Sequence, residues 1–415
     1  MSEAPPSSTP LPSRTARVLR TERRLVHWLL HSASAPPVAL ELWDESRILP
    51  DSGSPIATVR IRTRKALYRM LADPEFQIAG CYVEGDLVIE GDLVALLELA
   101  TRSAPRKGSV QTSLIHKLRR YQLGIRPHHA HNNIQAHYDV GNEFYRLWLD
   151  PTMTYTCAYF ADDNATLHDA QVAKMDLVCD KLGLRPGDRV VEVGCGWGSL
   201  ALHMAERYGA SVRAFNLSSE QTSYAREQAR TRELTGRVEF VNDDYRAVTG
   251  SYDAFVCVGM LEHVGLRQYA ELGRLIDRCL VGGGRGLLHS IGRHRHFPPN
   301  RWMQRTIFPE GYVPSLREMM AVFEAGDLVV HDVENLRDHY TLTLEHWLEG
   351  FEQHRAEVER MFDERFVRTW RLYLASCIAS FRAGWHQLYQ LVFTRSGEST
   401  SLPTRRLEPR RHRSA

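Results

Sequence analysis

Residues 190–205 read VVEVGCGWGSLALHMA, and this stretch decides the fold. An apolar run typical of a buried strand is followed by Gly194, Gly196 and Gly198, and then by a stretch of helical character. Glycine permits the positive φ angles of a tight turn and lets the backbone approach a ligand closely. The pattern predicts a strand, a glycine-rich turn and a helix, with Glu192 leading into the turn.

The same alternation of strand and helix continues toward the carboxyl terminus. It predicts an α/β fold with a doubly wound, mainly parallel sheet, and ligands of such sheets bind where the strand order reverses. The expected strands are RVVEV (189–193), SVRAF (211–215), RVEFV (237–241), DAFVCV (253–258) and RGLLHS (285–290).

The whole-chain composition excludes several classes of protein. The 415 residues are 43% hydrophobic and 25% charged, a globular composition, and a formal net charge of +2 does not indicate nucleic-acid binding. Seven spread cysteines without a CxxC pair indicate buried thiols in a reducing compartment and no metal site. No signal-peptide pattern or apolar run of about 18 residues occurs, so we expect a cytoplasmic protein that associates peripherally with the inner face of a membrane.

Composition also divides the chain into segments. Residues 1–15 are rich in Pro, Ser and Thr and are expected to be a disordered tail, and residues 396–415 form a basic tail. Residues 16–110 predict a small α+β domain that engages lipid, 111–129 a linker, and 130–395 the main domain. The basic helix near residue 20 either lies on anionic lipid or packs on its own domain with a solvated basic face, and the second is favoured.

Polar side chains follow the second and third strands of the main domain. A lone glycine-rich turn is weak evidence, but its strand context, Glu192 and the missing third fingerprint glycine favour S-adenosylmethionine over NAD. Ribose hydroxyls and an adenine ring need polar and aromatic groups such as Asn216, Gln221, Asp244 and Tyr245. Each of these residues alone is explained at least as well as a solvated loop residue, and their common location favours a cofactor pocket.

Another strand ends in GMLEHVG, residues 259–265, which places a carboxylate beside an imidazole. From the residues alone, Glu262 and His263 either contribute to a site or simply pair with each other or cap the next helix. Taken in isolation, the structural interpretation is the favoured one.

From about residue 130 to 395 the chain resembles the cyclopropane-fatty-acyl-phospholipid synthases and the related mycolic acid cyclopropane synthases. The resemblance implies a Rossmann-like class I methyltransferase sheet with a smaller amino-terminal α+β domain. It rests on HYDVGNEFYRLWLDPTMTYTCAYF (137–160), VEVGCGWG (191–198), DDYR (243–246), GMLEHVG (259–265), LLHSIG (287–292), RWMQRTIFPEGYVPSL (301–316), DHYTLTL (338–344) and FRAGWHQLYQLVF (381–393).

The resemblance implies an S-adenosylmethionine-dependent enzyme that adds a methylene group to a cis double bond of a phospholipid acyl chain, with bicarbonate as base. The bicarbonate-binding residues that it implies are Cys157 and Ile291, through their backbones, and Glu262, His289 and Tyr340. The cofactor-binding residues that it implies are Tyr155, Thr156, Gly194, Gly196, Asn216, Gln221 and Tyr245. Thr156 and Asn216 depart from the serine and threonine common in the family, yet both keep a hydrogen-bonding side chain.

Two chemical expectations follow from this assignment. Glu262 beside an anion is repulsive unless one partner carries a proton to share, so we expect a protonated or proton-sharing contact. Aromatic faces can stabilise developing positive charge, and ordinary core packing explains the same residues equally well. The candidates are Tyr155, Tyr159, Phe160, Trp302 and Tyr340.

Two other functions stay open: a family methyltransferase that makes a methyl- or methylene-branched acyl chain, and a catalytically silent lipid-binding protein. Intact Glu262, His289 and Tyr340 count against the second. The expected partners are phospholipid acyl chains at the membrane surface, and the resemblance suggests a homodimer. Acyl-chain length, double-bond position and headgroup preference have no recognisable signature in the sequence.

Overall fold

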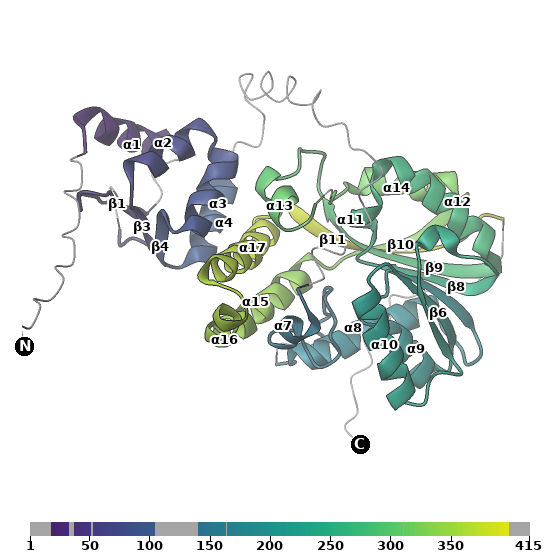
Figure 1. Cartoon of the computed structure of the whole chain (residues 1–415). Coiled ribbons are helices and arrows are strands. Elements are labelled where there is room, and N and C mark those ends of the chain that lie inside the picture. The colour runs from purple at the N-terminus through teal and green to yellow at the C-terminus, as the bar shows by residue number, and fades with distance from the viewer. Residues whose placement is uncertain are drawn as a thin grey trace, which may run out of the picture. The chain divides into compact units, whose positions relative to one another are not determined.

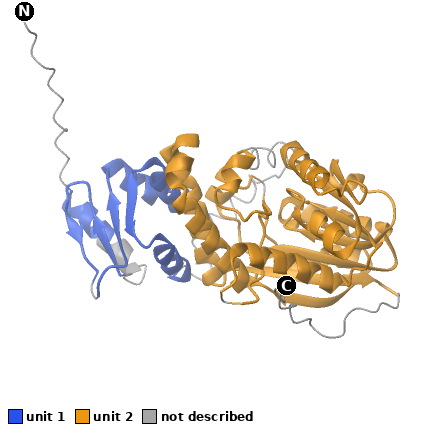
Figure 2. Ribbon diagram, turned by 90° about the horizontal axis from the view of Figure 1, so that it is seen from below, with its two compact units in different colours: residues 1–104 blue, residues 105–415 orange. Residues whose placement is uncertain are grey.

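The structure is a computed structural model that describes residues 18–32, 37–50, 53–103, 140–162, 164–309 and 311–397. It divides into two compact units, residues 1–104 and residues 105–415 (Figure 2). The predicted tail at 1–15 and the predicted linker at 111–129 lie outside the described residues, and so does the basic tail beyond residue 397.

The amino-terminal unit combines helices with a small mixed sheet, as the α+β prediction requires (Figure 1). Its strand order is β2-β1-β3-β4, with β1 parallel to β3 and the other pairs antiparallel. Strand β4 forms after Gly85 because Val88 and Ile89 favour extended backbone. The elements are α1 (Arg20–Ser32), β1 (Val38–Glu41), β2 (Arg47–Ile48), β3 (Ala57–Ile61), α2 (Arg64–Ala72), α3 (Pro74–Glu84), β4 (Leu87–Gly91) and α4 (Leu93–Ser103).

Helix α1 packs against its own unit. The carboxylate of Glu22, which is 2% exposed, lies 2.7 Å from Nε of Arg64 and accepts a hydrogen bond from the hydroxyl of Tyr68. Val26 is also buried. The packing interpretation is therefore confirmed, and the helix presents basic side chains to solvent, namely Arg20, Arg23 and Arg24.

The second unit contains a seven-stranded sheet in the order β10-β11-β9-β8-β5-β6-β7 (Figure 1). The strands from β9 to β7 pair in parallel, while β11 is antiparallel to both of its neighbours. All five predicted strands are present. The strands are β5 (Arg189–Val193), β6 (Ser211–Asn216), β7 (Val238–Asn242), β8 (Tyr252–Val258), β9 (Leu280–Arg293), β10 (Leu328–Asn335) and β11 (His386–Arg395).

Helices cover both faces of this sheet, which is why its central strands β5 and β8 are mostly apolar. Alternate residues of one strand face opposite ways: Val190 packs with α8, α9 and α10, whereas Val191 packs with α12 and α14. The helices and turns are α7 (Asn142–Arg146), α8 (Leu167–Leu182), α9 (Ser199–Tyr208), α10 (Ser219–Thr231), η2 (Tyr245–Ala247), α11 (Leu261–Val264), η3 (Leu266–Gln268), α12 (Tyr269–Cys279), α13 (Arg301–Thr306), α14 (Leu316–Ala325), α15 (Arg337–Gln353), α16 (Arg355–Met361) and α17 (Glu364–Arg382).

The strand order reverses between β5 and β8. From β5 the chain proceeds outward through β6 and β7, and then returns to β8 on the other side of β5. The glycine-rich turn after β5 and the short helix α11 after β8 are therefore neighbours. A Cβ built on Gly194 would lie 2.8 Å from Cβ of Met260, directly before α11.

The cysteines lie mostly in the interior of the protein. All seven cysteines are free thiols, and six of them are buried. In the part of the chain that the structure describes, no helix has the length and apolar character needed to cross a bilayer.

Candidate active site

The glycine-rich turn is shaped by its neighbours and leaves one side open. The backbone N–H groups of Gly194 and Cys195 both donate to the carbonyl of Phe215 on β6, at 2.9 and 3.1 Å. A Cβ on Gly198 would lie 2.6 Å from the ring of Phe240, whereas a Cβ on Gly196 would meet nothing within 4 Å. Gly196 thus offers the open, close approach that a bound cofactor needs.

Asn216 and Gln221 lie together beside this turn. The side-chain amide of Asn216 donates to the carbonyl of Gly196 at 3.1 Å and to the side-chain oxygen of Gln221 at 2.9 Å. Asn216 ends β6, and Gln221 lies in the first turn of α10, which Ser218 caps. The fold therefore brings the predicted residues of the second strand end to the glycine-rich turn.

Asp244 and Tyr245 follow β7, and Arg246 engages both. The guanidinium Nε of Arg246 lies 2.7 Å from the carboxylate of Asp244, and the guanidinium carbon lies 5.6 Å from the ring centroid of Tyr245. The Tyr245 hydroxyl donates to Gln268 at 3.3 Å. A cofactor that used Asp244 would have to share its carboxylate with Arg246.

Thr156 lies in the loop that follows α7, near the place where the strand order reverses between β5 and β8. Its hydroxyl accepts a hydrogen bond from Nζ of Lys174 at 3.0 Å, and its carbonyl accepts one from Gln171 at 2.8 Å. Its methyl group would lie 3.1 Å from a Cβ built on Gly259, directly after β8. Thr156 is thus fixed from two directions, next to the end of β8.

Glu262 points its carboxyl group back at the sheet. One oxygen accepts a hydrogen bond from the backbone N–H of Ile291 at 2.6 Å, and the other has no partner among the described residues. Neither α11 nor η3 and α12, which follow it, has a side-chain cap at its amino terminus, so Glu262 caps none of them. Burial raises the pKa of Glu262 to about 7, against the lowering effect of nearby polar groups of its own backbone, Ile291 and Ser290.

This pKa predicts a pH-dependent stability. Because the folded pKa of Glu262 exceeds the unfolded value of about 4.5, its favourable contribution is complete below pH 4.5 and is lost as the pH rises through 7. Glu262→Gln should match the original chain near pH 4.5 and exceed it at pH 8 by about 1–3 kcal/mol of unfolding free energy. Urea denaturation at the two pH values measures this difference.

Glu318 provides the matched control with the opposite sign. Burial raises its pKa, but hydrogen bonds from Ser315 and Tyr312 outweigh burial and lower it to about 2. Glu318→Gln should therefore be less stable than the original chain at pH 8. If the unfolding free energy of Glu262→Gln did not rise relative to that of the original chain between pH 4.5 and 8, the assigned burial of that carboxyl group would be contradicted.

His289 lies on β9, opposite Val258 at the end of β8. Its ring is 1% exposed, Nδ1 lies 3.0 Å from the side-chain nitrogen of Gln390, and Nε2 has no partner among the described residues. Burial lowers the pKa of His289 well below its ordinary value, and the positive charges of Lys174 and Lys181 lower it further. The ring is therefore neutral at physiological pH.

Cys157 and Tyr340 both contact the carbonyl of Leu336. The Cys157 thiol is buried and contacts the carbonyl of Leu336 at 3.9 Å, directly before the helix that carries Tyr340. The N–H of Leu336 donates to the carbonyl of Leu388, whose strand position is opposite Ile291. Burial raises the pKa of the Cys157 thiol well above its usual range, so this thiol is not an activated nucleophile.

One cluster of aromatic rings contains both a predicted cofactor residue, Tyr155, and a predicted bicarbonate residue, Tyr340. The rings of Tyr155 and Tyr340 both pack on Trp347, with centroids 5.0 and 5.9 Å away, and the Tyr155 hydroxyl lies 2.7 Å from that of Tyr373. The other three aromatic candidates pack elsewhere: Tyr159 stacks on His339, Phe160 stacks on His346, and Trp302 is buried on α13.

His263 has a position separate from the carboxyl group of its neighbour. Its ring centroid lies 6.1 Å from that of Phe308, and burial lowers its pKa to about 4. The adjacent pair in the sequence is thus divided in the structure: Glu262 points to β9 and His263 packs against an aromatic ring.

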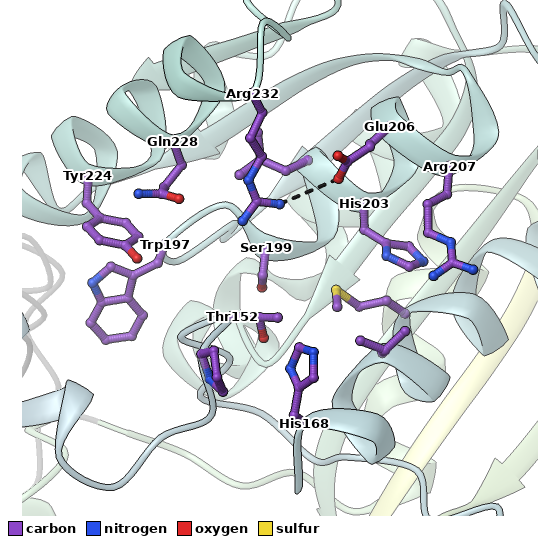
Figure 3. Close-up of a pocket in the computed structure, with 14 residues that line it drawn as sticks. Thr152, His168, Trp197, Ser199, His203, Glu206, Arg207, Tyr224, Gln228 and Arg232 are labelled. Atoms are coloured by element: carbon purple, nitrogen blue, oxygen red, sulfur yellow. Dashed lines mark ion pairs between the residues drawn. The ribbon is translucent and has the colours of Figure 1, made fainter. Parts of the chain in front are cut away.

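A separate cavity of about 260 Å³ lies among α8, α9 and α10 (Figure 3). Its lining includes Trp197 and Ser199 from the glycine-rich turn, and Arg232 crosses it toward Glu206 at 3.6 Å. None of the predicted cofactor or bicarbonate residues lines it. The predicted site is defined by the strand ends and not by this cavity.

Sequence reasoning missed several buried polar residues around the site. Lys174 is 1% exposed and Gln171 is fully buried, and Lys181 and Gln390 bond to each other beside His289. Positions 171, 174, 178 and 181 share one face of α8, so a run of polar residues on the same face as the buried Val178 is the signal that could have found them.

The doubly wound sheet, the glycine-rich turn after its first strand and the polar groups at the neighbouring strand ends define a class I methyltransferase. The family model for mycolic acid cyclopropane synthetase matches residues 126–391, so the chain belongs to that family. It is an S-adenosylmethionine-dependent methyltransferase.

Individual relatives support this membership. The chain is 35% identical over 86% of its length to a probable fatty acid methyltransferase of Pseudomonas putida, covering 91% of that protein. It is 40% identical over 64% of its length to the cyclopropane-fatty-acyl-phospholipid synthase of Escherichia coli K12, covering 68% of it. Mycolic acid cyclopropane synthase CmaA1, solved in complex with SAH and CTAB, matches 65% of this chain and 99% of its own at 31% identity, with a TM-score of 0.61.

Proposed function

We propose that this protein transfers a methylene group from S-adenosylmethionine to a cis double bond of an unsaturated phospholipid acyl chain and forms a cyclopropane ring. The observation that carries the proposal is that two of the buried polar atoms without a partner among the described residues, Oε2 of Glu262 and Nε2 of His289, belong to residues at neighbouring strand ends. Buried polar groups are normally satisfied, so such atoms at a strand-end site indicate a polar ligand. The Escherichia coli relative, named as a phospholipid cyclopropane synthase, supports the same substrate class.

The reaction makes two carbon–carbon bonds at the former double bond. The alkene attacks the sulfonium methyl, the sulfur–carbon bond breaks, and S-adenosylhomocysteine leaves with the electron pair. The cation that forms on the acyl chain then loses a proton from the transferred methyl group, and that carbon closes the ring. A base must therefore act beside a cation, in a site from which water is excluded.

We assign the base site to Glu262, His289, Tyr340 and the backbones of Cys157 and Ile291. When bound, bicarbonate supplies the base that removes the proton. With a pKa of about 7, the Glu262 carboxyl group can carry a proton near neutral pH and present an O–H donor to an anion. His289 is neutral and does not compete for the proton.

Tyr155 and Tyr340, which pack on the same tryptophan, are the aromatic groups assigned to the developing positive charge. The Tyr155 and Tyr373 hydroxyls bond to each other, which holds the Tyr155 ring in place. The cofactor is assigned to the open side of Gly196 with Thr156, Asn216 and Gln221 around it.

A lipid analysis tests the proposed reaction. The full chain is expressed in cells that make unsaturated phospholipids and lack a cyclopropane synthase, and acyl chains are examined by mass spectrometry before and after hydrogenation. We expect chains heavier by one CH₂ group that take up no hydrogen. Unchanged lipids with a folded, S-adenosylmethionine-binding protein would support the silent lipid-binding alternative.

A branched product is the second candidate, because a relative that matches 86% of this chain is named a probable fatty acid methyltransferase. The same analysis separates the two reactions. A methylene branch also adds CH₂ but keeps a double bond that takes up hydrogen. A methyl branch carries two further hydrogens, which a separate hydride donor must supply. Either of those products would contradict ring formation.

We further propose that the amino-terminal unit engages anionic lipid through the exposed arginines of α1. Charge-based binding should weaken as salt rises, because the attraction is screened. Replacing Arg20, Arg23 and Arg24 with glutamine should reduce sedimentation with vesicles containing phosphatidylglycerol. The matched control replaces three exposed arginines of the second unit, namely Arg230, Arg232 and Arg237. Binding that ignores both salt and the α1 substitutions would contradict the proposal.

A further inference from the structure

Behind His289 lies a chain of polar contacts, buried at Gln390 and partly buried at Lys181 and Glu334, that the proposed reaction does not use directly. Gln390 is fully buried on β11, directly opposite His289 in the β9–β11 register. Its side-chain oxygen lies 2.6 Å from Nζ of Lys181, and its side-chain nitrogen lies 3.0 Å from Nδ1 of His289. Lys181 is in turn paired with Glu334 at 2.5 Å.

The chemistry of Lys181 fixes the orientation of the Gln390 amide. An ammonium group only donates hydrogen bonds, so the amide atom that faces it must be the oxygen. The NH₂ group of Gln390 then faces Nδ1 of His289. Because an amide NH₂ only donates, Nδ1 must accept with its lone pair.

A neutral imidazole carries one ring proton, so an accepting Nδ1 leaves that proton on Nε2. We infer that Glu334, Lys181 and Gln390 are positioning residues that hold His289 as the tautomer protonated on Nε2. The use of that N–H toward bound bicarbonate rests on the proposed function, whereas the tautomer itself does not.

This arrangement gives His289 a single chemical role. Its Nε2–H is a fixed donor, buried and without a partner among the described residues, and it is available to an acceptor such as a carboxylate-like oxygen. Its other ring nitrogen is occupied by Gln390, so His289 cannot take up the proton that the reaction releases. His289 therefore binds the proposed base, bicarbonate, and does not itself remove the proton.

The substitution Gln390→Glu tests the inference because it keeps the shape and reverses one contact. Lys181 still pairs with one carboxylate oxygen, and the other oxygen, which can only accept, now faces Nδ1. A proton must then reside on Nδ1, which gives either the opposite tautomer or an imidazolium. Nitrogen-15 spectra of the histidine-labelled full chain report the state of each ring nitrogen, and the His289 signals are those lost in His289→Asn.

We expect a lone-pair Nδ1 and a protonated Nε2 in the original chain, and a protonated Nδ1 in Gln390→Glu. The control Gln387→Glu makes the same change at a buried residue of the same strand whose amide contacts Gly384 and Asn335, and it should leave the His289 signals in place. The wrong proton position should also lower kcat by about 10²-fold without changing S-adenosylmethionine affinity.

A protonated Nδ1 in the original chain, or a lone-pair Nδ1 retained in Gln390→Glu, would overturn the inference. If Gln390→Glu fails to fold, Lys181→Met replaces it: freeing the amide oxygen should produce a mixture of tautomers, and an unchanged Nε2–H tautomer contradicts the role of Lys181. The spectra test the tautomer independently of the proposed function, because the predicted tautomer can be observed even if turnover does not depend on bicarbonate.

Discussion

Replacing Glu262 with glutamine is expected to lower turnover by about 10²- to 10⁴-fold, the range typical of losing an acid–base group. The glutamine oxygen can still accept the bond from the Ile291 N–H, so the local backbone should keep its position. The glutamine NH₂ that replaces the second oxygen can still donate a hydrogen bond to an anion, but it cannot take up or release a proton as a carboxyl group does. Steady-state release of S-adenosylhomocysteine from unsaturated phospholipid vesicles measures the change.

Binding of S-adenosylmethionine, followed by calorimetry, should be unchanged in this variant, because Glu262 lies outside the proposed cofactor contacts. His289→Ala and Tyr340→Phe should behave in the same way. Glu318→Gln is the matched control: it removes a carboxylate whose hydrogen-bond partners, Ser315, Tyr312 and His296, are not among the proposed site residues, and it should keep normal turnover. Normal turnover in all three site variants would contradict the assignment of the anion pocket.

Replacing Gly196 with alanine should abolish measurable S-adenosylmethionine binding while the protein stays folded. The added methyl group would meet no protein atom within 4 Å, so it would project into the space assigned to the cofactor. Its left-handed φ of +54° adds a backbone cost of about 1–2 kcal/mol. Calorimetric titration together with thermal unfolding measures the two effects.

Gly187→Ala separates backbone strain from blocked binding. Gly187 lies before the same strand, also has a left-handed φ, at +89°, and would also meet nothing within 4 Å. Both variants should lose a similar amount of stability, and only Gly196→Ala should lose the cofactor. Full binding by Gly196→Ala would show that the cofactor lies elsewhere.

The strands and the glycine-rich turn were predictable because their signals are local. A parallel sheet that is covered on both faces requires continuous apolar runs, and RVVEV and DAFVCV have that character. The turn after β5 needs glycine at positions 194 and 198 because neighbouring side chains leave no room for a Cβ. Sequence neighbours thus carry most of the information about these elements.

The direction of each side chain was not predictable from the sequence. Glu262 and His263 are adjacent, yet the first bonds to β9 and the second packs on Phe308, because a one-residue step in α11 turns the side chain by about 100°. Asp244 follows a strand as expected, but its own neighbour Arg246 engages it. Long-range packing decides such contacts.

The chain of polar contacts behind His289 could not be predicted from local sequence either. Gln390 belongs to a motif that carries the family resemblance. Lys181 belongs to a helix and precedes Gln390 by 209 residues. Nothing in either local sequence indicates a bond between them. Only the pairing of β9 with β11, and the packing of α8 on that part of the sheet, brings the two side chains together.

If Glu262 and His289 hold a bicarbonate base, turnover must depend on bicarbonate in the medium, and depletion measures this dependence. Turnover of the full chain with unsaturated phospholipid vesicles is measured in buffer purged of carbon dioxide, and again after bicarbonate is returned. We predict a fall of at least about 10-fold that added bicarbonate restores in the original chain and not in Glu262→Gln. Equal turnover with and without bicarbonate would contradict the account.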